Sequence, residues 1–211
     1  MHRLHLTLLA ATLLAPVLPA AQAATACGPA EQPGLERCVT GLPAATIAAM
    51  HQVQRASQWC WAASISMVLA RYGIAVDQEQ VVRAHFGAVA DQPVPQEAVA
   101  QLLNRDWRDA RGQALQASAA PLPRWRKAAG LAAPEVLEEL DAGRPLLVGA
   151  NQHAMVLVQL VYERPLDPAA GPLRLLRAVV LDPAQAVGVR SLKPAEREPT
   201  FLARVRVEPL P

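Results

Sequence analysis

Cys60 is the residue of this sequence that is best placed to act as a nucleophile. It lies near the start of the run WCWAASISMVLARYG, in which apolar residues recur at helical spacing. A thiol in the first turn of a helix feels the partial positive charge of unpaired amide N–H groups, which lowers its pKa from about 8.5 to as low as roughly 3.5–7.5. Because cysteine is also among the most frequently buried residues, a core position between Trp59 and Trp61 is the alternative.

A thiolate nucleophile needs a histidine, which forms the ion pair and later protonates the leaving amine. After residue 23 the candidates are His51, His85 and His153. His85 lies within a predicted helix, and His51 lies on a polar stretch with no strand to fix it. His153 opens the apolar run HAMVLVQLVY directly after a short polar segment, so a strand would fix its backbone at the strand end. We favour His153, although a lone histidine at a strand start is more often structural.

Asp182 is the candidate for the group that orients the imidazole. It closes the predicted strand RAVVLD, and Pro183 prevents the strand ladder from continuing. An aspartate before a proline is also a common turn former. Two adjacent strands that end in a histidine and an aspartate nonetheless meet the requirement of a hydrogen-bonded pair, so the sequence predicts a site of Cys60, His153 and Asp182.

The elements that would position this site indicate an α+β fold. Helices are predicted over 44–50 and from Cys60 to Gly73, from Asp77 to about Phe86, after Pro95, and from Pro134 to Gly143. Strand-like runs follow: PLLVGA, HAMVLVQLVY, LRLLRAVVLD and FLARVRV. Helices followed by strands are typical of an α+β domain with a largely antiparallel sheet. Residues 106–129 show weak periodicity and no predicted element.

Residues 1–23 are typical of a secretory signal peptide. A basic start is followed by an apolar run over 6–20 and by Ala21, Gln22 and Ala23, which fit an A-x-A cleavage site. The run is shorter than the roughly 20 uninterrupted apolar residues that span a bilayer. We therefore expect a secreted or periplasmic protein without a stable membrane span. A lipoprotein attached through Cys27 is the alternative, although the preceding Ala, Thr and Ala match a lipid-attachment signal poorly.

Export changes the interpretation of the three cysteines, because an oxidising compartment lets thiols pair. Cys27 and Cys38 lie close together in a segment that contains glycine and proline, so we favour a disulfide between them, with Cys60 free. The alternatives are three reduced thiols or a disulfide that includes Cys60. Residues 24–50 are expected to form a loop-rich, disulfide-clipped lead-in, and residues 51–211 the main domain.

Composition excludes several classes of function. The chain has 211 residues, of which 52% are hydrophobic, and its 20 Lys and Arg against 18 Asp and Glu leave no basic surplus for a nucleic-acid partner. The sequence has no HExxH motif, no CxxC pair and no glycine-rich phosphate loop, so we expect neither a metal nor a cofactor. The sequence does not specify an oligomeric state.

The run QRASQWCWAAS, followed by NQHAMVLV and VVLDP, resembles the papain-like cysteine peptidases, and more narrowly the compact bacterial AvrRpt2 and C39-like group. The resemblance spans about residues 50–183, and the order Cys, His, Asp agrees with it. It implies a papain-like fold, in which an N-terminal helical part carries the nucleophile and an antiparallel sheet carries His153 and Asp182. It also implies a thiol peptidase that acts on a peptide or protein substrate.

The resemblance further implies an oxyanion hole. Gln54 stands six positions before Cys60, the spacing at which the family places a glutamine that donates its side-chain amide, and Gln58 and Gln52 are the competing candidates. The position before the histidine is commonly glycine in relatives but is Gln152 here, which implies a narrower approach to the histidine.

Two other functions stay open at this point. The first is a thiol acyltransferase or amidase of the same architecture, and the second is a non-catalytic binding module. Residues 184–199 do not resemble the family, and they could form a loop over the cleft or a connection to the last strand.

Overall fold

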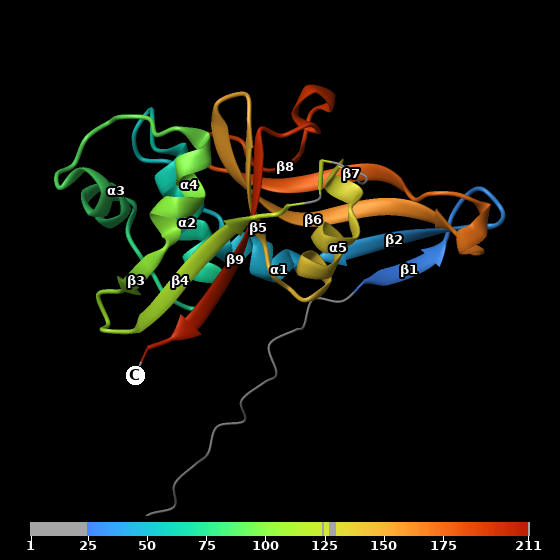
Figure 1. Cartoon of the computed structure of the whole chain (residues 1–211), viewed down its shortest axis with the longest axis horizontal. Coiled ribbons are helices and arrows are strands. Elements are labelled where there is room, and N and C mark those ends of the chain that lie inside the picture. The colour runs from blue at the N-terminus through green and yellow to red at the C-terminus, as the bar shows by residue number, and fades with distance from the viewer. Residues whose placement is uncertain (1–24, 124, 127–129, 211) are drawn as a thin grey trace, which may run out of the picture.

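A long central strand, β6 (His153–Pro165), organises the sheet (Figure 1). One edge of β6 pairs first with β5 (Leu146–Ala150) and then with β2 (Leu35–Gly41), while its other edge pairs with β7 (Arg174–Asp182). The computed structural model describes residues 25–123, 125–126 and 130–210. Within these ranges every strand pairing is antiparallel, which confirms the predicted α+β class.

The remaining strands extend this sheet in both directions. Its order is β1-β2-β6-β5-β9-β4-β3, with β7 and β8 branching from the other edge of β6. The added strands are β1 (Ala26–Pro29), β3 (Arg105–Arg108), β4 (Ala114–Pro121), β8 (Gly188–Ser191) and β9 (Phe201–Pro209).

The helices begin and end close to the positions that the sequence predicts. Asp77 caps α3 by accepting a hydrogen bond from the Glu79 N–H, Pro95 precedes α4, and Gly87 ends α3 in the left-handed region. The helices are α1 (Ala44–Met50), α2 (Cys60–Arg71), α3 (Gln78–Phe86), α4 (Gln96–Leu103) and α5 (Pro134–Asp141). Short 3-10 turns lie at Gly130–Ala132, Pro168–Ala170 and Pro194–Glu196.

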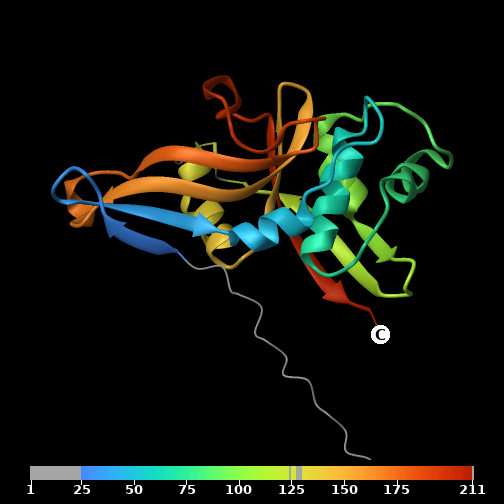
Figure 2. The same cartoon turned by 180° about the vertical axis from the view of Figure 1, so that it is seen from behind.

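The helices cover both faces of the sheet. Because side chains alternate along a strand, Ala154 and Val156 pack against the core shared with α1–α4, whereas Met155 and Leu157 face the core shared with α5. Helix α2 is buried along residues 61–69 and so provides a rigid support for its first residue, Cys60. Figure 2 shows α1 and α2 from behind, in blue and teal, beside the central strands.

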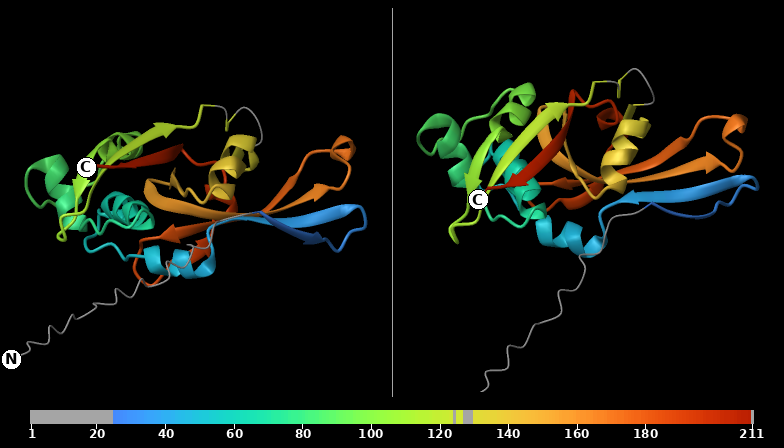
Figure 3. Two further views of the ribbon diagram at one scale, coloured as in Figure 1. Left: turned by 90° about the horizontal axis from the view of Figure 1, so that it is seen from below. Right: turned by 60° about the horizontal axis from the view of Figure 1, so that its bottom comes forward.

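Residues 24–50 differ from the loop-rich lead-in that the sequence suggests. Strands β1 and β2 form a hairpin, and β2 pairs along its whole length with β6. The four residues of β1 are all exposed, so no alternation of apolar and polar residues marks this strand in the sequence. The hairpin lies beside the far half of β6, away from α2–α4 (Figure 3).

A disulfide joins Cys27 and Cys38, which oppose each other in the β1–β2 register. No element is predicted over 106–129, where the structure has most of β3 and all of β4. The predicted signal peptide, residues 1–23, lies outside the described residues. In the described part of the chain, every helix is too short or too polar to cross a membrane.

We predict that a Cys27→Ser, Cys38→Ser variant loses about 3 kcal/mol of unfolding free energy, because the disulfide no longer restricts the unfolded chain. The two cysteines are 11 residues apart in sequence. Urea denaturation of both proteins measures the loss, and wild-type protein under reducing conditions should match the variant. Equal unfolding midpoints for oxidised wild type and variant would contradict this stabilising role.

Candidate active site

The two tryptophans beside Cys60 hold the start of α2 in place. Trp59 and Trp61 are both buried, and their indole N–H groups donate to the carbonyl oxygens of Ala90 (2.8 Å) and Gln92 (3.2 Å). Both rings therefore tie α2 to the segment between α3 and α4. Cys60 lies between them but is only partly buried, and it is the one free cysteine among the described residues.

His153 and Asp182 meet because they lie on paired antiparallel strands. His153 is the first residue of β6 and Asp182 the last of β7, so both lie at the same end of this antiparallel strand pair. The Nε2 atom of His153 is 2.6 Å from Oδ1 of Asp182. The thiol of Cys60 interacts with the same imidazole and with the backbone N–H of Ala154. The three predicted residues thus lie together.

The electrostatics of this group favour a charged pair. Burial by itself raises the pKa of the Cys60 thiol, but the hydrogen bond with His153 and those from the Ala154 and Trp61 backbone outweigh it and lower the pKa. Burial lowers the pKa of His153, yet its bonds to Asp182 and Cys60 raise it from 6.5 to about 9. Between these two pKa values the thiolate and imidazolium forms coexist.

Asp182 is held ionised despite its burial. Desolvation raises its pKa, but hydrogen bonds from His153, from the Ala184 backbone and from Arg190 bring the pKa well below its usual range. The Ala184 N–H donates to Oδ1 at 2.9 Å, and the Arg190 Nε–H donates to Oδ2 at 2.7 Å. The carboxylate therefore presents a fixed negative charge to the imidazole.

Gln54 lies beside the site, but its amide is engaged locally. Its backbone N–H donates to the Pro183 carbonyl at 2.7 Å, which places it next to the end of β7. Its side-chain Nε2 donates to the carbonyls of Ala56 and Ser57, both at 2.9 Å, and so stabilises the turn that leads into α2.

The two competing glutamines have other surroundings. Gln52 accepts a long hydrogen bond, 3.4 Å, from the side chain of Gln78. Gln58 is exposed, and its backbone N–H donates to Asp91 at 2.8 Å.

The turn before His153 adopts a backbone conformation that favours glycine. Asn151 and Gln152 have φ values of 52° and 60°, as in the two-residue turn of a tight β-hairpin. This requirement explains why a residue without a side chain suits the position of Gln152. When the Gln96 amide is oriented so that both its oxygen and its nitrogen are satisfied, its side-chain oxygen accepts from the N–H groups of Gln152 (2.8 Å) and His153 (2.7 Å) and so fixes the turn.

The other histidines do not join the site. His51 packs against Gly188, and its ring Nε2 is buried without a hydrogen-bond partner among the described residues. His85 is exposed on α3 and contacts the edge of Trp61. Neither lies at the Cys60 thiol, which leaves His153 as the histidine that contacts it.

The remaining tryptophans occupy different surroundings. Trp107 is buried in the core, and its indole N–H donates to the Leu103 carbonyl at 3.0 Å. Trp125 is 7% exposed and lines a hollow of about 370 Å³ next to Phe201. Phe201 opposes Gly149 in β5, so this hollow lies two strands from His153 along the same sheet edge.

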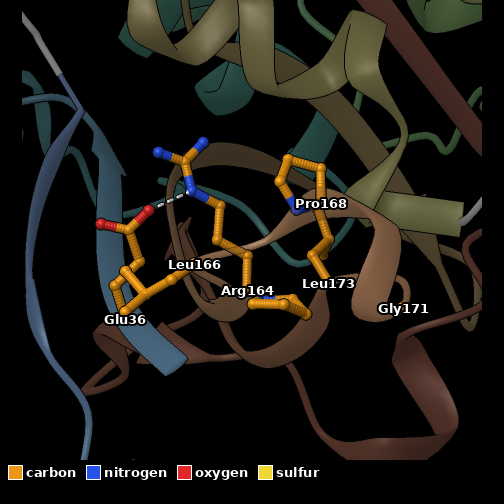
Figure 4. A pocket seen from close by; sticks show the side chains of 7 residues that line it. Glu36, Arg164, Leu166, Pro168, Gly171 and Leu173 are labelled. Atoms are coloured by element: carbon orange, nitrogen blue, oxygen red, sulfur yellow. Dashed lines mark hydrogen bonds and ion pairs between the residues drawn. The ribbon is translucent and has the colours of Figure 1, made fainter. Parts of the chain in front are cut away.

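A second hollow, shown in Figure 4, is lined by residues of β2, β6 and the segment after β6. It measures about 400 Å³ and is rimmed by the ion pair of Glu36 with Arg164, whose atoms are 2.7 Å apart. Arg164 is 11 residues beyond His153 on β6, which corresponds to more than about 30 Å along the strand. Glu36 also lies near the sulfurs of Cys27 and Cys38, but the disulfide and the ion pair already engage these potential metal ligands.

Comparison with known proteins identifies the family of the chain. The sequence model of the family described as papain-like cysteine protease AvrRpt2 matches residues 43–193, which is most of the chain. The chain therefore belongs to this family, whose members are cysteine-type peptidases of papain-like, α+β architecture. No curated protein matches the chain.

The solved structures that are similar to the chain include two at low identity. One is a double glycine motif protease from an AMS/PCAT transporter in complex with the leader peptide, with 24% identity over 75% of this chain and 89% of that chain and a TM-score of 0.41. The other is UfSP from C. elegans, with 13% identity over 82% of this chain and 34% of that chain and a TM-score of 0.42. The chain thus corresponds to about a third of UfSP.

We predict that alkylation of Cys60 by iodoacetamide follows a two-step pH profile. The first step lies below the pKa of an ordinary thiol, and the second lies near pH 9, where His153 loses its proton. In Asp182→Asn the second step should move to lower pH, because the carboxylate no longer stabilises the imidazolium. A single step at the pKa of an ordinary thiol in the wild type would contradict the charged pair.

We also predict that Gln152→Gly stabilises the fold by about 0.5–1 kcal/mol, because glycine adopts a positive φ without the steric cost of a side chain. Asn151→Gly is the matched control and should gain less, since asparagine already tolerates this region. Thermal or urea denaturation measures both changes. A loss of stability in Gln152→Gly would show that contacts of the Gln152 side chain stabilise the fold by more than the steric cost of its positive φ.

Proposed function

We propose that the protein is an exported thiol peptidase that hydrolyses peptide or amide bonds through a thioester on Cys60. The observation that carries this proposal is the contact of the Cys60 thiol with an imidazole whose Nε2 is 2.6 Å from a buried carboxylate. Membership of the cysteine protease family supports it. In this proposal Cys60 is the nucleophile, His153 the acid and base, and Asp182 the group that orients His153.

Acylation begins with the charged pair. The Cys60 thiolate forms a bond to the carbonyl carbon of the substrate, and the carbonyl electron pair moves onto oxygen. The tetrahedral intermediate then collapses, the C–N bond breaks, and the leaving amine takes the proton from His153. The products of this step are a thioester and a neutral imidazole.

Deacylation returns the enzyme to its starting state. Neutral His153 removes a proton from water, whose oxygen attacks the thioester carbon. Collapse of the second intermediate breaks the C–S bond and releases a carboxylic acid and the thiolate. The proton kept by His153 restores the imidazolium, whose pKa of about 9 keeps it charged near neutral pH.

Donors near Cys60 would stabilise the oxyanion of both intermediates. We propose the backbone N–H of Cys60 and the side-chain amide of Gln54 for this role. The two bonds from Gln54 Nε2 to the Ala56 and Ser57 carbonyls already place the amide at the turn that precedes the nucleophile. One of them must give way when substrate binds, because an amide nitrogen has only two hydrogens.

The disulfide between Cys27 and Cys38 supports export, since such bonds persist mainly in oxidising compartments. We propose that residues 1–23 act as the signal peptide. Residues 24–50 then form the disulfide-clipped lead-in at the N-terminus of the exported protein, ahead of the peptidase domain of residues 51–211. The β1–β2 hairpin of this lead-in extends the sheet that carries His153.

We predict that Cys60→Ser abolishes cleavage of a proteome-derived peptide library, as measured by mass spectrometry of the new termini. A serine hydroxyl is far less acidic than a thiol, so it does not form the ion pair with His153. Full activity of Cys60→Ser would refute the proposed mechanism. New amides formed from an added amine, in place of hydrolysis products, would instead assign an acyltransferase.

We predict that Gln54→Ala lowers kcat about a hundredfold, as expected for loss of one oxyanion donor, while alkylation of Cys60 continues. Gln58→Ala is the comparison variant, because the exposed Gln58 lies in the same turn. Kinetics on a cleaved peptide and iodoacetamide labelling give both readouts. A larger loss of kcat in Gln58→Ala than in Gln54→Ala would assign the donor to Gln58.

A further inference from the structure

Residues 184–199, which follow Asp182, do not form a simple connection. They fold back as β8 (Gly188–Ser191), which pairs with β7, and then as the 3-10 turn Pro194–Glu196. Gly188 opposes Asp182 and Arg190 opposes Val180, so the side chain of Arg190 lies on the face of the sheet that Asp182 shares. Figure 1 shows β8 beside the end of β7.

Arg190 bridges two buried carboxylates. Its Nε–H donates to Oδ2 of Asp182 at 2.7 Å, and its two terminal nitrogens donate to Glu196 at 2.6 and 2.9 Å. One of these nitrogens also lies 3.2 Å from the sulfur of Met155, two residues after His153. The side chains of Arg190, Asp182 and Glu196 are only 18%, 5% and 8% exposed. A guanidinium held at this many points has little freedom to turn.

Glu196 is fixed in its own turn. It accepts a hydrogen bond from the Lys193 N–H at 2.7 Å in addition to both bonds from Arg190. Charges therefore alternate from Cys60 through His153, Asp182 and Arg190 to Glu196. Each member of this series therefore contacts only oppositely charged members of it.

As a buried, charged group, Asp182 requires a hydrogen-bond partner for each of its two carboxylate oxygens. An aspartate with one oxygen on the imidazole has a second oxygen that must be bonded when buried. Arg190 fills that position, while the Ala184 N–H and His153 bind the first oxygen. With both oxygens bonded, the carboxylate plane is fixed, and so is the direction in which it accepts from His153.

We propose that Arg190 and Glu196 are positioning residues of the active site: Glu196 orients Arg190, which holds the Asp182 carboxylate in the plane that aligns the His153 ring with Cys60. This inference rests on the proposed function, because it assigns the segment after Asp182 to the same reaction. In this proposal, residues 184–199 hold the Asp182 carboxylate in position.

The first test compares Arg190→Ala with Arg37→Ala. Arg37 is a matched control, because it pairs at 2.7 Å with the buried carboxylate of Glu163, at the far end of β6. We expect kcat on a cleaved peptide to fall about tenfold or more in Arg190→Ala, with little change in KM and none of this loss in Arg37→Ala. Methylguanidinium at millimolar concentration should restore part of the kcat of Arg190→Ala. The Glu196→Gln variant should show a smaller loss of kcat than Arg190→Ala.

The pH profile of Cys60 alkylation separates positioning from a simple charge effect. The charged groups around the pair are Cys60 from α2, His153 from β6, Asp182 from β7, Arg190 from β8 and Glu196 from the 3-10 turn. In Arg190→Ala the step near pH 9 should move to lower pH, because a turning carboxylate stabilises the imidazolium less. A move to higher pH would overturn the proposal, since it would mean that Arg190 only withdraws charge from Asp182.

A double-mutant cycle completes the test. In the Asp182→Asn background, Arg190→Ala should lower kcat less than twofold, because its effect passes through Asp182. An equal loss in both backgrounds, or a loss in Arg190→Ala no greater than in Arg37→Ala, would overturn the inference. These outcomes are distinct from failure of the proposed function, which would appear as activity retained in Cys60→Ser.

Discussion

The antiparallel pairing of β6 with β7 is the constraint on which the site depends. It places the first residue of one strand beside the last residue of the other, at the same end of the strand pair, where His153 and Asp182 form a 2.6 Å contact. Because side chains alternate along a strand, a slip of one residue would turn His153 to the opposite face. Pairing with β2 and β5 and burial in two cores hold β6 in register.

Burial and hydrogen bonding have opposing effects on the ionisation of Cys60, His153 and Asp182. Burial alone would favour a neutral thiol and a neutral imidazole, and it would raise the pKa of the carboxyl group. Short contacts between the groups outweigh the burial of each, so the site is stable only as a connected series of charges. Of the elements that carry the groups, α2 is buried over residues 61–69 and β6 is covered on both faces.

Local sequence signals were sufficient for the helices and for the strands that carry the site. Apolar periodicity, the Asp77 cap, Pro95 before α4 and Pro134 at the start of α5 predict element types and bounds well. The β1–β2 hairpin was missed because β1 is exposed and its strand character comes from pairing with distant residues. Arg190 and Glu196 were missed for the same reason, since only the fold-back of residues 184–199 brings them to Asp182.

The protonation state of His153 shows directly whether Cys60 and His153 form a charged pair. Nitrogen NMR of the protein labelled at histidine rings resolves whether one or both ring nitrogens carry a proton. We expect His153 to be doubly protonated at pH 7 and to lose a proton near pH 9, and we expect Cys60→Ala to lower this pKa because the thiolate is gone. A singly protonated His153 at pH 7, with a pKa unaffected by Cys60→Ala, would contradict the charged pair.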